Sequence, residues 1–478
     1  MNYKNISIVN SLIWKFLERG GVQVTQFVVS VIIARLLLPT DYGAVALLMI
    51  FISIATVFVQ SGLNTALIQK KDADEIDSSS VFYYSLGLAT IIYVCLYFFA
   101  KYIAIFYNIP ELTSLLRVLA LTLFPGALNS LQIALLSKQM LFKKQFYSSM
   151  FASIISGILG IFFAYYGFGA WALVWQQLSY QFLVCLVLWK LVSWRPKFIF
   201  SYQRTKLLLS FGLKLLGARL IDTLYHNLES LIIGKIFSAE TLAFCNKGKQ
   251  FPLTLIDNID GSIQSVMLPA YSANQENLMD VKRMLRKTIS LSTYLVFPAM
   301  TLLAVTGKPV VYLLLGNNWI NCVPYLQLFC FIAMLFPLQT ANLQAINAIG
   351  RSEIYLKLIT WKRVLGVILL FAAVNIWHSP FAVVGAALLV EFLAILVNVP
   401  SNKKVLRYSL TEMFCDIAPN LLLSIIIGIT CYCLLSLFQS MLITLILQIV
   451  CGATLFVLLS IVFKNTNFNY IYGLLIKK

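Results

Sequence analysis

The chain has 478 residues, of which 60% are hydrophobic and only 11% are charged. Soluble domains carry about 25% charged residues, so this composition excludes an ordinary soluble protein and indicates a polytopic membrane protein. The formal charge of +18 would suggest nucleic acid in a soluble protein, but here the excess lies mostly in joints between apolar runs, and we expect no nucleic-acid partner. Nine scattered cysteines without a CxxC pair and only two histidines predict neither a disulfide framework nor a metal site.

About fourteen apolar runs are long enough to cross a bilayer as helices, since each span needs about 20 residues. The runs are 10–38, 42–68, 80–107, 112–137, 145–166, 170–192, 207–237, 241–271, 285–315, 320–349, 355–377, 381–400, 415–437 and 441–463. The predicted fold class is therefore an all-α polytopic membrane protein with about 14 transmembrane helices.

Joints that are rich in lysine and arginine alternate along the chain with joints that are poor in them. Several opposite joints, at 167–169, 379–380 and 439–440, have none. The joints after even-numbered helices contain Lys70, Lys71, Lys138, Lys143, Lys144, Arg195, Lys197, Arg204, Lys206, Lys282, Arg283, Arg286, Lys287, Arg351, Lys357, Lys403, Lys404 and Arg407. The positive-inside rule then predicts that both termini and all basic joints are cytoplasmic.

Two internal matches indicate a duplication. Residues 32–44 align with 232–244 at an offset of 200, and residues 129–139 align with 341–351 at an offset of 212. We therefore expect two six-helix bundles related by a pseudo-two-fold axis along the membrane normal, with a cavity between them. The predicted domains are an N-terminal six-helix bundle at 1–192, a basic cytoplasmic linker at 193–206, a C-terminal six-helix bundle at 207–400 and two additional transmembrane helices at 401–478.

The run 207–237 carries four ionisable residues in its middle, namely Arg219, Asp222, His226 and Glu229. Their spacings of three, four and three place them on one helical face. A lipid-exposed charge at mid-membrane costs roughly 2.5–3.5 kcal/mol even on the lenient insertion scale, so this face must meet other helices or a wet cavity.

Several motifs occur in a characteristic order. The segment 34–43, ARLLLPTDYG, resembles the ARxLxPxDYG segment of polysaccharide-unit flippases, and 62–71, GLNTALIQKK, resembles their GLxxALIQ segment. Further markers are GAWALV at 169–174, WRP at 194–196, FG at 211–212, IIGK at 232–235 and GNNW at 316–319. Over about residues 10–400 the chain is similar to the Wzx-like lipopolysaccharide and exopolysaccharide branch of the multidrug/oligosaccharidyl-lipid/polysaccharide exporter superfamily.

This resemblance implies a bacterial plasma-membrane flippase for O-antigen, capsule or exopolysaccharide export. By alternating access it would move an undecaprenyl-diphosphate-linked oligosaccharide from the cytoplasmic to the outer leaflet. The expected partners are this lipid-linked substrate, the bilayer, a polymerase and other polysaccharide-assembly proteins. Glu229 departs from the pattern, because an aspartate is expected there, but the charge is kept.

For the substrate pyrophosphate the first candidates are Arg19 and Arg219, which occupy matched repeat positions. The alternative is local neutralisation of each arginine. Asp222 lies one turn from Arg219, whereas Glu18 adjoins Arg19 without sharing its helical face, which Lys15 does share. Lys247, Lys249 and Arg117 are further candidates, with snorkelling to the interface as the alternative.

Amide side chains are candidates for the sugar path, since sugar hydroxyls need both donors and acceptors. These candidates are Asn64, Gln132, Gln344 and Gln264, of which Gln132 and Gln344 are repeat partners. The alternative is hydrogen bonding between helices.

No cofactor and no metal are predicted, but coupling to H+ or Na+ is left open. The candidates for an ion-coupling carboxylate or its neighbour are Asp222, His226, Glu229, Asp257, Asp260 and Glu391. A purely structural polar network is the alternative.

Three other functions stay in view. A cation-coupled small-molecule exporter of the same superfamily needs a mainly acidic site, and a lipid II flippase is disfavoured only by the ordered motifs. A membrane polymerase or ligase is disfavoured because the outer joints are short and no nucleophile–base or metal-ligand spacing occurs. We therefore predict a transporter without catalytic residues.

Overall fold

The computed structural model describes residues 8–60, 62–63, 66–67, 70, 74–435 and 440–476. Within helices it leaves the side chains of 8–13, 16, 19, 207, 210–211 and 474–476 undescribed. The described residues form helices and short joints, and no strand occurs among them. This agrees with the predicted all-α class.

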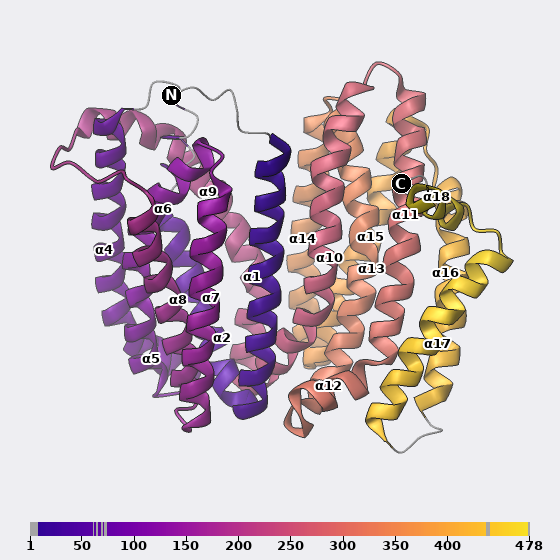
Figure 1. The fold of residues 1–478 in the computed structure, drawn as a ribbon, viewed down its shortest axis with the longest axis horizontal. Helices are drawn as coiled ribbons and strands as arrows, with labels where there is room; N and C mark the ends of the chain where they lie inside the picture. Colours follow the sequence, from indigo (N-terminus) through magenta and orange to yellow (C-terminus); the bar gives the residue numbers. More distant parts are fainter. Residues whose placement is uncertain are drawn as a thin grey trace. The chain divides into compact units, whose positions relative to one another are not determined.

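The chain divides into two compact units, Met1–Ala243 and Phe244–Lys478. In unit 1 the helices run up and down side by side (Figure 1). They are α1 (Ile8–Leu36), α2 (Pro39–Gln60), α4 (Glu75–Tyr107), α5 (Leu112–Leu119), η1 (Ala120–Thr122), α6 (Leu123–Lys138), α7 (Phe142–Tyr165), α8 (Ala170–Leu191) and α9 (Tyr202–Ile236). The boundary between the units falls within α10 (Ala239–Ala273).

Unit 2 contains the rest of α10 and the helices that follow it. They are α11 (Leu278–Val305), α12 (Gly307–Leu315), η2 (Asn317–Cys322), α13 (Val323–Ala348), α14 (Ser352–Trp377), α15 (Pro380–Leu406), α16 (Leu410–Leu435), α17 (Met441–Val462) and α18 (Thr466–Ile476). Helix α11 packs on α13 and α16, and α15 packs on both α13 and α14.

Helices lie at all the predicted apolar runs, with three differences in detail. The predicted run 112–137 is divided into α5, η1 and α6. The predicted run 285–315 is broken, since α11 ends at Val305 and α12 begins at Gly307. The short helix α18 was not predicted at all. Among the described residues, 11 helices are long and apolar enough to cross a membrane. Helices α9 and α10 fall short of that composition because polar groups interrupt them. The fully described part of α1, Gly20–Leu36, is a shorter apolar helix.

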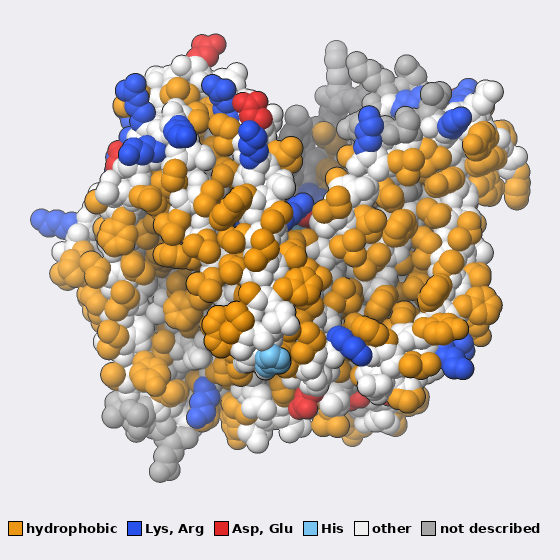
Figure 2. Space-filling model, turned by 180° about the vertical axis from the view of Figure 1, so that it is seen from behind, with side chains coloured by type: hydrophobic (Ala, Val, Ile, Leu, Met, Phe, Trp, Pro, Cys, Tyr) orange, Lys and Arg blue, Asp and Glu red, His pale blue; other side chains and the backbone are white. Residues whose placement is uncertain are grey.

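The helices differ in how much of their apolar surface is covered. Only 17% of the most apolar window of α4 is buried, 11% of that of α14 and 17% of that of α17. In contrast, 61% of the window in Leu112–Lys138 is buried inside unit 1, and 56% of that in Asn317–Ala348 inside unit 2. Hydrophobic side chains cover the middle of each unit on the face in Figure 2, as expected of surfaces that meet lipid.

The predicted linker 193–206 is fastened to the start of α4. The backbone N–H of Lys197 donates to Ser79 Oγ at 3.1 Å, and that of Ser201 donates to Ser80 Oγ at 3.0 Å. Arg204 pairs with the α4 N-cap residue Asp74. The hydrogen bond from the Asp77 backbone and the contact with Arg204 lower the pKa of Asp74 to about 2.

Helix α9 belongs to unit 1 by its contacts, since it packs on α2 and α4. The predicted domains at 1–192, 207–400 and 401–478 concern the sequence duplication and stay a prediction. What the structure adds is that the first helix of the second repeat is folded against the first half of the chain.

Candidate functional site

The two matched repeat segments at 32–44 and 232–244 form two corners that touch each other. One corner joins α1 to α2 and the other joins α9 to α10. A Cβ atom on Gly43 would lie 1.8 Å from the carbonyl oxygen of Ala239, so only glycine allows this approach. Tyr42 supports the first corner by donating from its hydroxyl to the Ser30 carbonyl at 3.0 Å. The glycine of the DYG motif therefore lets the backbones of the two corners pack directly against each other.

The polar stripe of α9 lies largely on the surface of the structure. Arg219 and His226 are exposed, and Asp222 and Glu229 are half-buried. His226 Nε2 lies 3.7 Å from Asp222 Oδ1, so Asp222 and His226 form a pair on this stripe. Next to this pair, Asn227 donates to the Thr223 carbonyl at 2.8 Å and to Ser53 Oγ of α2 at 3.3 Å. Asn227, next to the stripe, is thus hydrogen-bonded to α2, whereas Arg219 and His226 of the stripe are exposed.

Three other predicted anion-binding residues lie against neighbouring rings. Lys247 is 95% buried, donates to Gln250 at 3.2 Å and lies 5.9 Å from the centre of the Trp319 ring. Lys249 is half-buried, 5.5 Å from the Phe329 ring. Arg117 donates to the Tyr97 carbonyl at 3.2 Å and stacks 4.1 Å over the Tyr97 ring of α4.

Some predicted residues lie outside what the structure describes. Arg19 belongs to α1, but its side chain is undescribed, so its matched position with Arg219 stays a sequence prediction. Asn64 and residues 65, 68–69 and 71 of the GLxxALIQ-like segment are also outside the described residues.

The remaining sugar-path candidates have different surroundings. Gln132 is completely buried in α6, whereas its repeat partner Gln344 is half-buried in α13. Gln264 is exposed and donates to Asp260 Oδ2 at 3.4 Å on the same helix. Asp257, one turn earlier in α10, is exposed. The structure therefore brings Gln264 and Asp260 together.

Glu391 lies in a polar network at the middle of three unit 2 helices. Lys362 Nζ of α14 is 2.8 Å from Glu391 Oε2 of α15. Gln339 of α13 donates to the same oxygen and to the Glu391 backbone carbonyl, both at 2.8 Å. Lys362 also attracts the Asp260 carboxylate of α10 electrostatically. The structure therefore pairs one predicted coupling carboxylate, Glu391, with a lysine.

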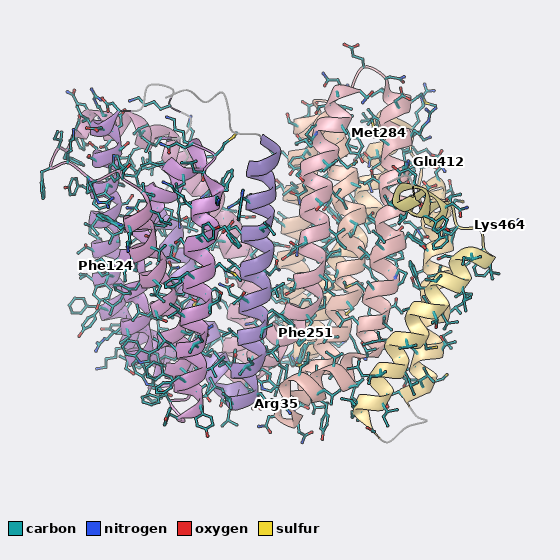
Figure 3. All side chains as sticks on the ribbon, viewed as in Figure 1. Arg35, Phe124, Phe251, Met284, Glu412 and Lys464 are labelled. Atoms are coloured by element: carbon teal, nitrogen blue, oxygen red, sulfur yellow. The ribbon has the colours of Figure 1, made fainter. Side chains whose placement is uncertain are left out.

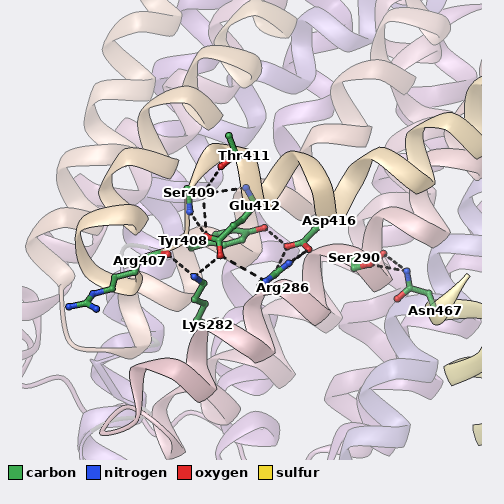
Figure 4. A network of polar contacts seen from close by, with 10 residues as sticks. All are labelled: Lys282, Arg286, Ser290, Arg407, Tyr408, Ser409, Thr411, Glu412, Asp416 and Asn467. Atoms are coloured by element: carbon green, nitrogen blue, oxygen red, sulfur yellow. Dashed lines mark hydrogen bonds and ion pairs between the residues drawn. The ribbon is translucent and has the colours of Figure 1, made fainter.

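A second cluster joins α16 to α11, as Figure 4 shows. Arg286 binds Asp416 through two nitrogens, with Nε 2.9 Å from Oδ2 and Nη2 2.7 Å from Oδ1. Lys282 binds Glu412 at 2.8 Å, and the Tyr408 hydroxyl donates to Asp416 Oδ2 at 3.0 Å. Two cations and two carboxylates make the cluster neutral, so it fixes the last helices to the bundle without adding charge.

Burial raises the pKa of the Tyr408 phenol, and the neighbouring Asp416 carboxylate raises it further. Tyr408 is completely buried between α15 and α16, so its phenol stays neutral and keeps donating its hydrogen bond. The cluster is therefore held by a neutral donor as well as by its ion pairs.

Replacing Asp416 with alanine should lower the melting temperature of the detergent-solubilised protein. The change leaves Arg286 and the Tyr408 hydroxyl without their acceptor, which costs about 1–3 kcal/mol. The matched control is Asp280→Ala, because Asp280 lies on the same end of α11 and its contacts, a pair with Arg283 at 3.4 Å and a hydrogen bond from Asn277 at 2.7 Å, are exposed. Equal melting temperatures for the two variants would contradict this role of the cluster.

Sequence reasoning missed Lys362 and Gln339 and took Lys282 and Arg286 only as residues of a basic joint. One signal was available for the second cluster. Lys282 and Arg286 are four residues apart at the start of α11, and Glu412 and Asp416 are four apart at the start of α16. Two cations on one helix and two carboxylates on another, each set four residues apart, can form two ion pairs when the helix ends meet. No comparable signal marks Gln339.

Among the described residues, no group of three or more His, Cys, Asp or Glu is placed to hold a metal ion. The polar groups that gather at mid-helix are arginine, lysine, carboxylates and amides. Such groups bind and release charged or hydroxyl-rich molecules by ion pairs and hydrogen bonds.

The fold is shared with solved membrane transporters. A lipid II flippase MurJ in an inward closed conformation has a TM-score of 0.75 at 15% identity, over 96% of this chain and 99% of that one. An inward-facing multidrug resistance transporter of the MATE family has a TM-score of 0.62 at 17% identity, over 80% and 94%. The shared fold and the apolar helices of the described residues define a multi-pass, all-helical membrane protein.

The chain belongs to the polysaccharide biosynthesis protein family, whose model matches residues 32–324. It is 24% identical to the succinoglycan biosynthesis transport protein ExoT of Rhizobium meliloti over 67% of this chain and 65% of that protein. It is 23% identical to the teichuronic acid biosynthesis protein TuaB of Bacillus subtilis over 73% and 72%. It is 22% identical to the lipopolysaccharide biosynthesis protein WzxC of Escherichia coli over 64% and 62%.

The match spans less than two thirds of the length of ExoT and of WzxC. The family match at residues 32–324 confirms the resemblance stated from the motifs. That range includes Gly43 and most of the marker segments.

Proposed function

We propose that the chain is a flippase for undecaprenyl-diphosphate-linked oligosaccharide repeat units. It carries them from the cytoplasmic to the outer leaflet by alternating access, for O-antigen, capsule or exopolysaccharide export. The family and the names of its relatives support this proposal, because ExoT, TuaB and WzxC are named for polysaccharide transport or biosynthesis.

One observation carries the proposal, namely the exposed polar stripe of α9. Arg219 and His226 are exposed at mid-helix in a chain that is otherwise coated with hydrophobic side chains. Lipid does not tolerate such groups at that depth, so the stripe requires a wet path or a polar ligand. A pyrophosphate linked to sugars meets both requirements, because it brings negative charge and hydroxyl groups.

The proposed roles follow from charge. Arg219, with Arg19 as its repeat partner, binds the pyrophosphate, and Lys247, Lys249 and Arg117 are secondary anion contacts. Asn64, Gln132, Gln344 and Gln264 hydrogen-bond sugar hydroxyls along the path. The burial of Lys247 and Gln132 means that both depend on helix movement to meet substrate.

Coupling to H+ or Na+ belongs to the same proposal. The candidates are the pair of Asp222 and His226 with Glu229 in α9, and the pair of Glu391 and Lys362 in unit 2, with Asp260 and Asp257 on α10. In both places a carboxylate faces a basic side chain, which allows a proton or cation to change the balance of charge.

The proposed membrane arrangement has 14 spans in two six-helix bundles and two added helices, with both termini in the cytoplasm of a bacterial plasma membrane. The alternation of basic joints supports this orientation. A polymerase and other polysaccharide-assembly proteins are the proposed partners on either side of the transport step. Transport itself makes and breaks no covalent bond.

The test is flipping by the purified full chain in proteoliposomes. We expect transfer of a fluorescent undecaprenyl-diphosphate oligosaccharide, measured by quenching of the dye exposed on the outer face. Arg19→Ala combined with Arg219→Ala should reduce the rate at least tenfold, because both predicted pyrophosphate contacts are lost. Lys214→Ala is the control, since Lys214 lies on α9 but off the stripe.

The same vesicles separate the alternatives. A lipid II flippase would move lipid II in preference to the oligosaccharide, and a small-molecule exporter would move an organic cation dye. Either preference, or wild-type flipping by the double arginine variant, would overturn the proposal. The coupling ion is identified by imposing a pH gradient or a Na+ gradient across the vesicles. The gradient that changes the flipping rate is the one that drives transport.

A further inference from the structure

A cavity of about 560 Å³ lies in unit 2, where α16 meets the corner between α17 and α18. It adjoins the α11–α16 cluster through Asp416, which lines it, and lies apart from the Glu391–Lys362 network, none of whose residues lines it. One part of its lining is polar and includes Ser290, Asn465 and Asn467, and another part is apolar and includes Leu422 and Phe463. Leu422 is 60% exposed and Phe463 61% exposed, so the apolar part opens to the surroundings of the unit.

The corner is built rigidly from amide side chains. Asn465 accepts the Asn467 backbone N–H at 2.9 Å, which caps the start of α18, and donates to Asn420 at 3.3 Å. Asn467 donates to Ser290 Oγ at 2.9 Å. Asn420 donates to Thr293 of α11 at 2.9 Å. Asn420, Asn465 and Asn467 are each 91% or more buried and form the polar part of the cavity lining. Their hydrogen bonds make the cavity a fixed feature of the fold.

Lys464 is the charged residue at the rim of this cavity. It follows Phe463, the C-cap of α17, has the left-handed conformation with φ at 47°, and is exposed. Figure 3 places it at the outer edge of unit 2. Among the described residues Lys464 has no ion-pair partner.

The other charges at this cavity cancel. Asp416 lines it, but its carboxylate is bound by Arg286. The first turn of α18 begins at Thr466 beside Lys464, and a helix N-terminus adds partial positive charge. The rim is therefore positive, and it complements one negative charge.

A positive rim beside exposed apolar side chains matches the chemistry of a phospholipid, which has an anionic headgroup and apolar acyl chains. The cavity also lies beside the N-terminal end of α11 and the end of α17, on the side of the unit that carries the basic joint at 282–287. The cytoplasmic leaflet that the proposed topology assigns to this end is the one rich in anionic lipid.

We propose that this cavity binds one anionic phospholipid of the bilayer. Lys464 and the first turn of α18 hold its phosphate, and an acyl chain lies along Leu422 and Phe463. The inference uses the membrane orientation of the proposed function but not its substrate. Bound there, the lipid fastens α18 and the α16–α17 pair to the membrane surface.

The test is native mass spectrometry of the delipidated full chain in detergent, with phosphatidylglycerol or phosphatidylethanolamine of identical acyl chains. We expect one phosphatidylglycerol to bind more tightly than phosphatidylethanolamine. Lys464→Asn should weaken its binding about fivefold, since one lysine near anionic lipid contributes about that factor. Asparagine also tolerates the left-handed backbone, so the change removes the charge without adding strain.

Two further variants sharpen the result. Ala418→Trp fills the cavity while keeping the charge of Lys464 and should also abolish the tight site, because Ala418 lines the cavity. Lys357→Ala removes an exposed lysine of α14 that does not line it and should bind lipid like the wild type. Melting temperatures without lipid check that each variant is folded.

Equal retention of the two lipids, or wild-type binding by Lys464→Asn and Ala418→Trp, would overturn the proposal. So would displacement of phosphatidylglycerol by equimolar undecaprenyl diphosphate, because the site would then belong to the polyprenyl carrier. None of these readouts measures flipping, so failure here leaves the proposed transport function unaffected, and failure of flipping leaves the lipid site testable.

Discussion

Replacing Gly43 with alanine should prevent unit 1 from folding correctly. The added Cβ would lie 1.8 Å from the Ala239 carbonyl oxygen and 2.3 Å from its carbonyl carbon. Real contacts do not approach so closely, and the obstacle is backbone, so no side-chain rotation relieves it. Overpacking of a well-packed interior costs about 1–3 kcal/mol and sometimes more, and a clash with backbone belongs at the upper end.

The measurement is the yield and melting temperature of monodisperse protein after extraction from membranes. We expect little or no folded Gly43→Ala. Gly87→Ala is the matched control, since Gly87 is also helical but has nothing within 4 Å of the added Cβ. Alanine there should leave stability unchanged or raise it by about 0.5–1 kcal/mol, because glycine is the poorer helix former. A Gly43→Ala protein as stable as the wild type would show that the two corners do not pack as described.

Replacing Glu391 with alanine should destabilise unit 2 more than removal of any exposed charge. Lys362 is 27% exposed at its side chain and loses the carboxylate 2.8 Å away, and the Gln339 amide loses an acceptor. Removing one partner of a buried pair costs about 3–5 kcal/mol, and the partial exposure of Lys362 places this case near the lower value.

The decisive comparison is a double variant. Lys362→Met together with Glu391→Ala should recover most of the lost melting temperature, because the unpaired charge is then absent. Glu353→Ala serves as the control, since its pair with Arg351 is exposed at 59% and 66% of the two side chains and should contribute little. If Glu391→Ala melts like Glu353→Ala, or if the double variant is no better than the single one, the pair does not stabilise the fold.

Several features follow from the sequence by itself. Composition determined that the chain is a membrane protein, and the apolar runs located its helices, because a span must be long and apolar whatever surrounds it. The ordered motifs identified the family. The repeat segments at 32–44 and 232–244 marked two corners, and the structure places Gly43 of one against Ala239 of the other.

Only the tertiary structure decided which polar groups meet. The Glu391–Lys362 pair joins residues 29 positions apart, and Arg286 and Asp416 are separated by 130. It also decided that Lys247 and Gln132 are buried while Arg219 and His226 are exposed. In a soluble helix the polar face reveals the buried one, but a membrane helix is apolar both toward lipid and toward its neighbours. Periodicity therefore cannot tell these faces apart, and the choice of partners is made by packing between distant segments.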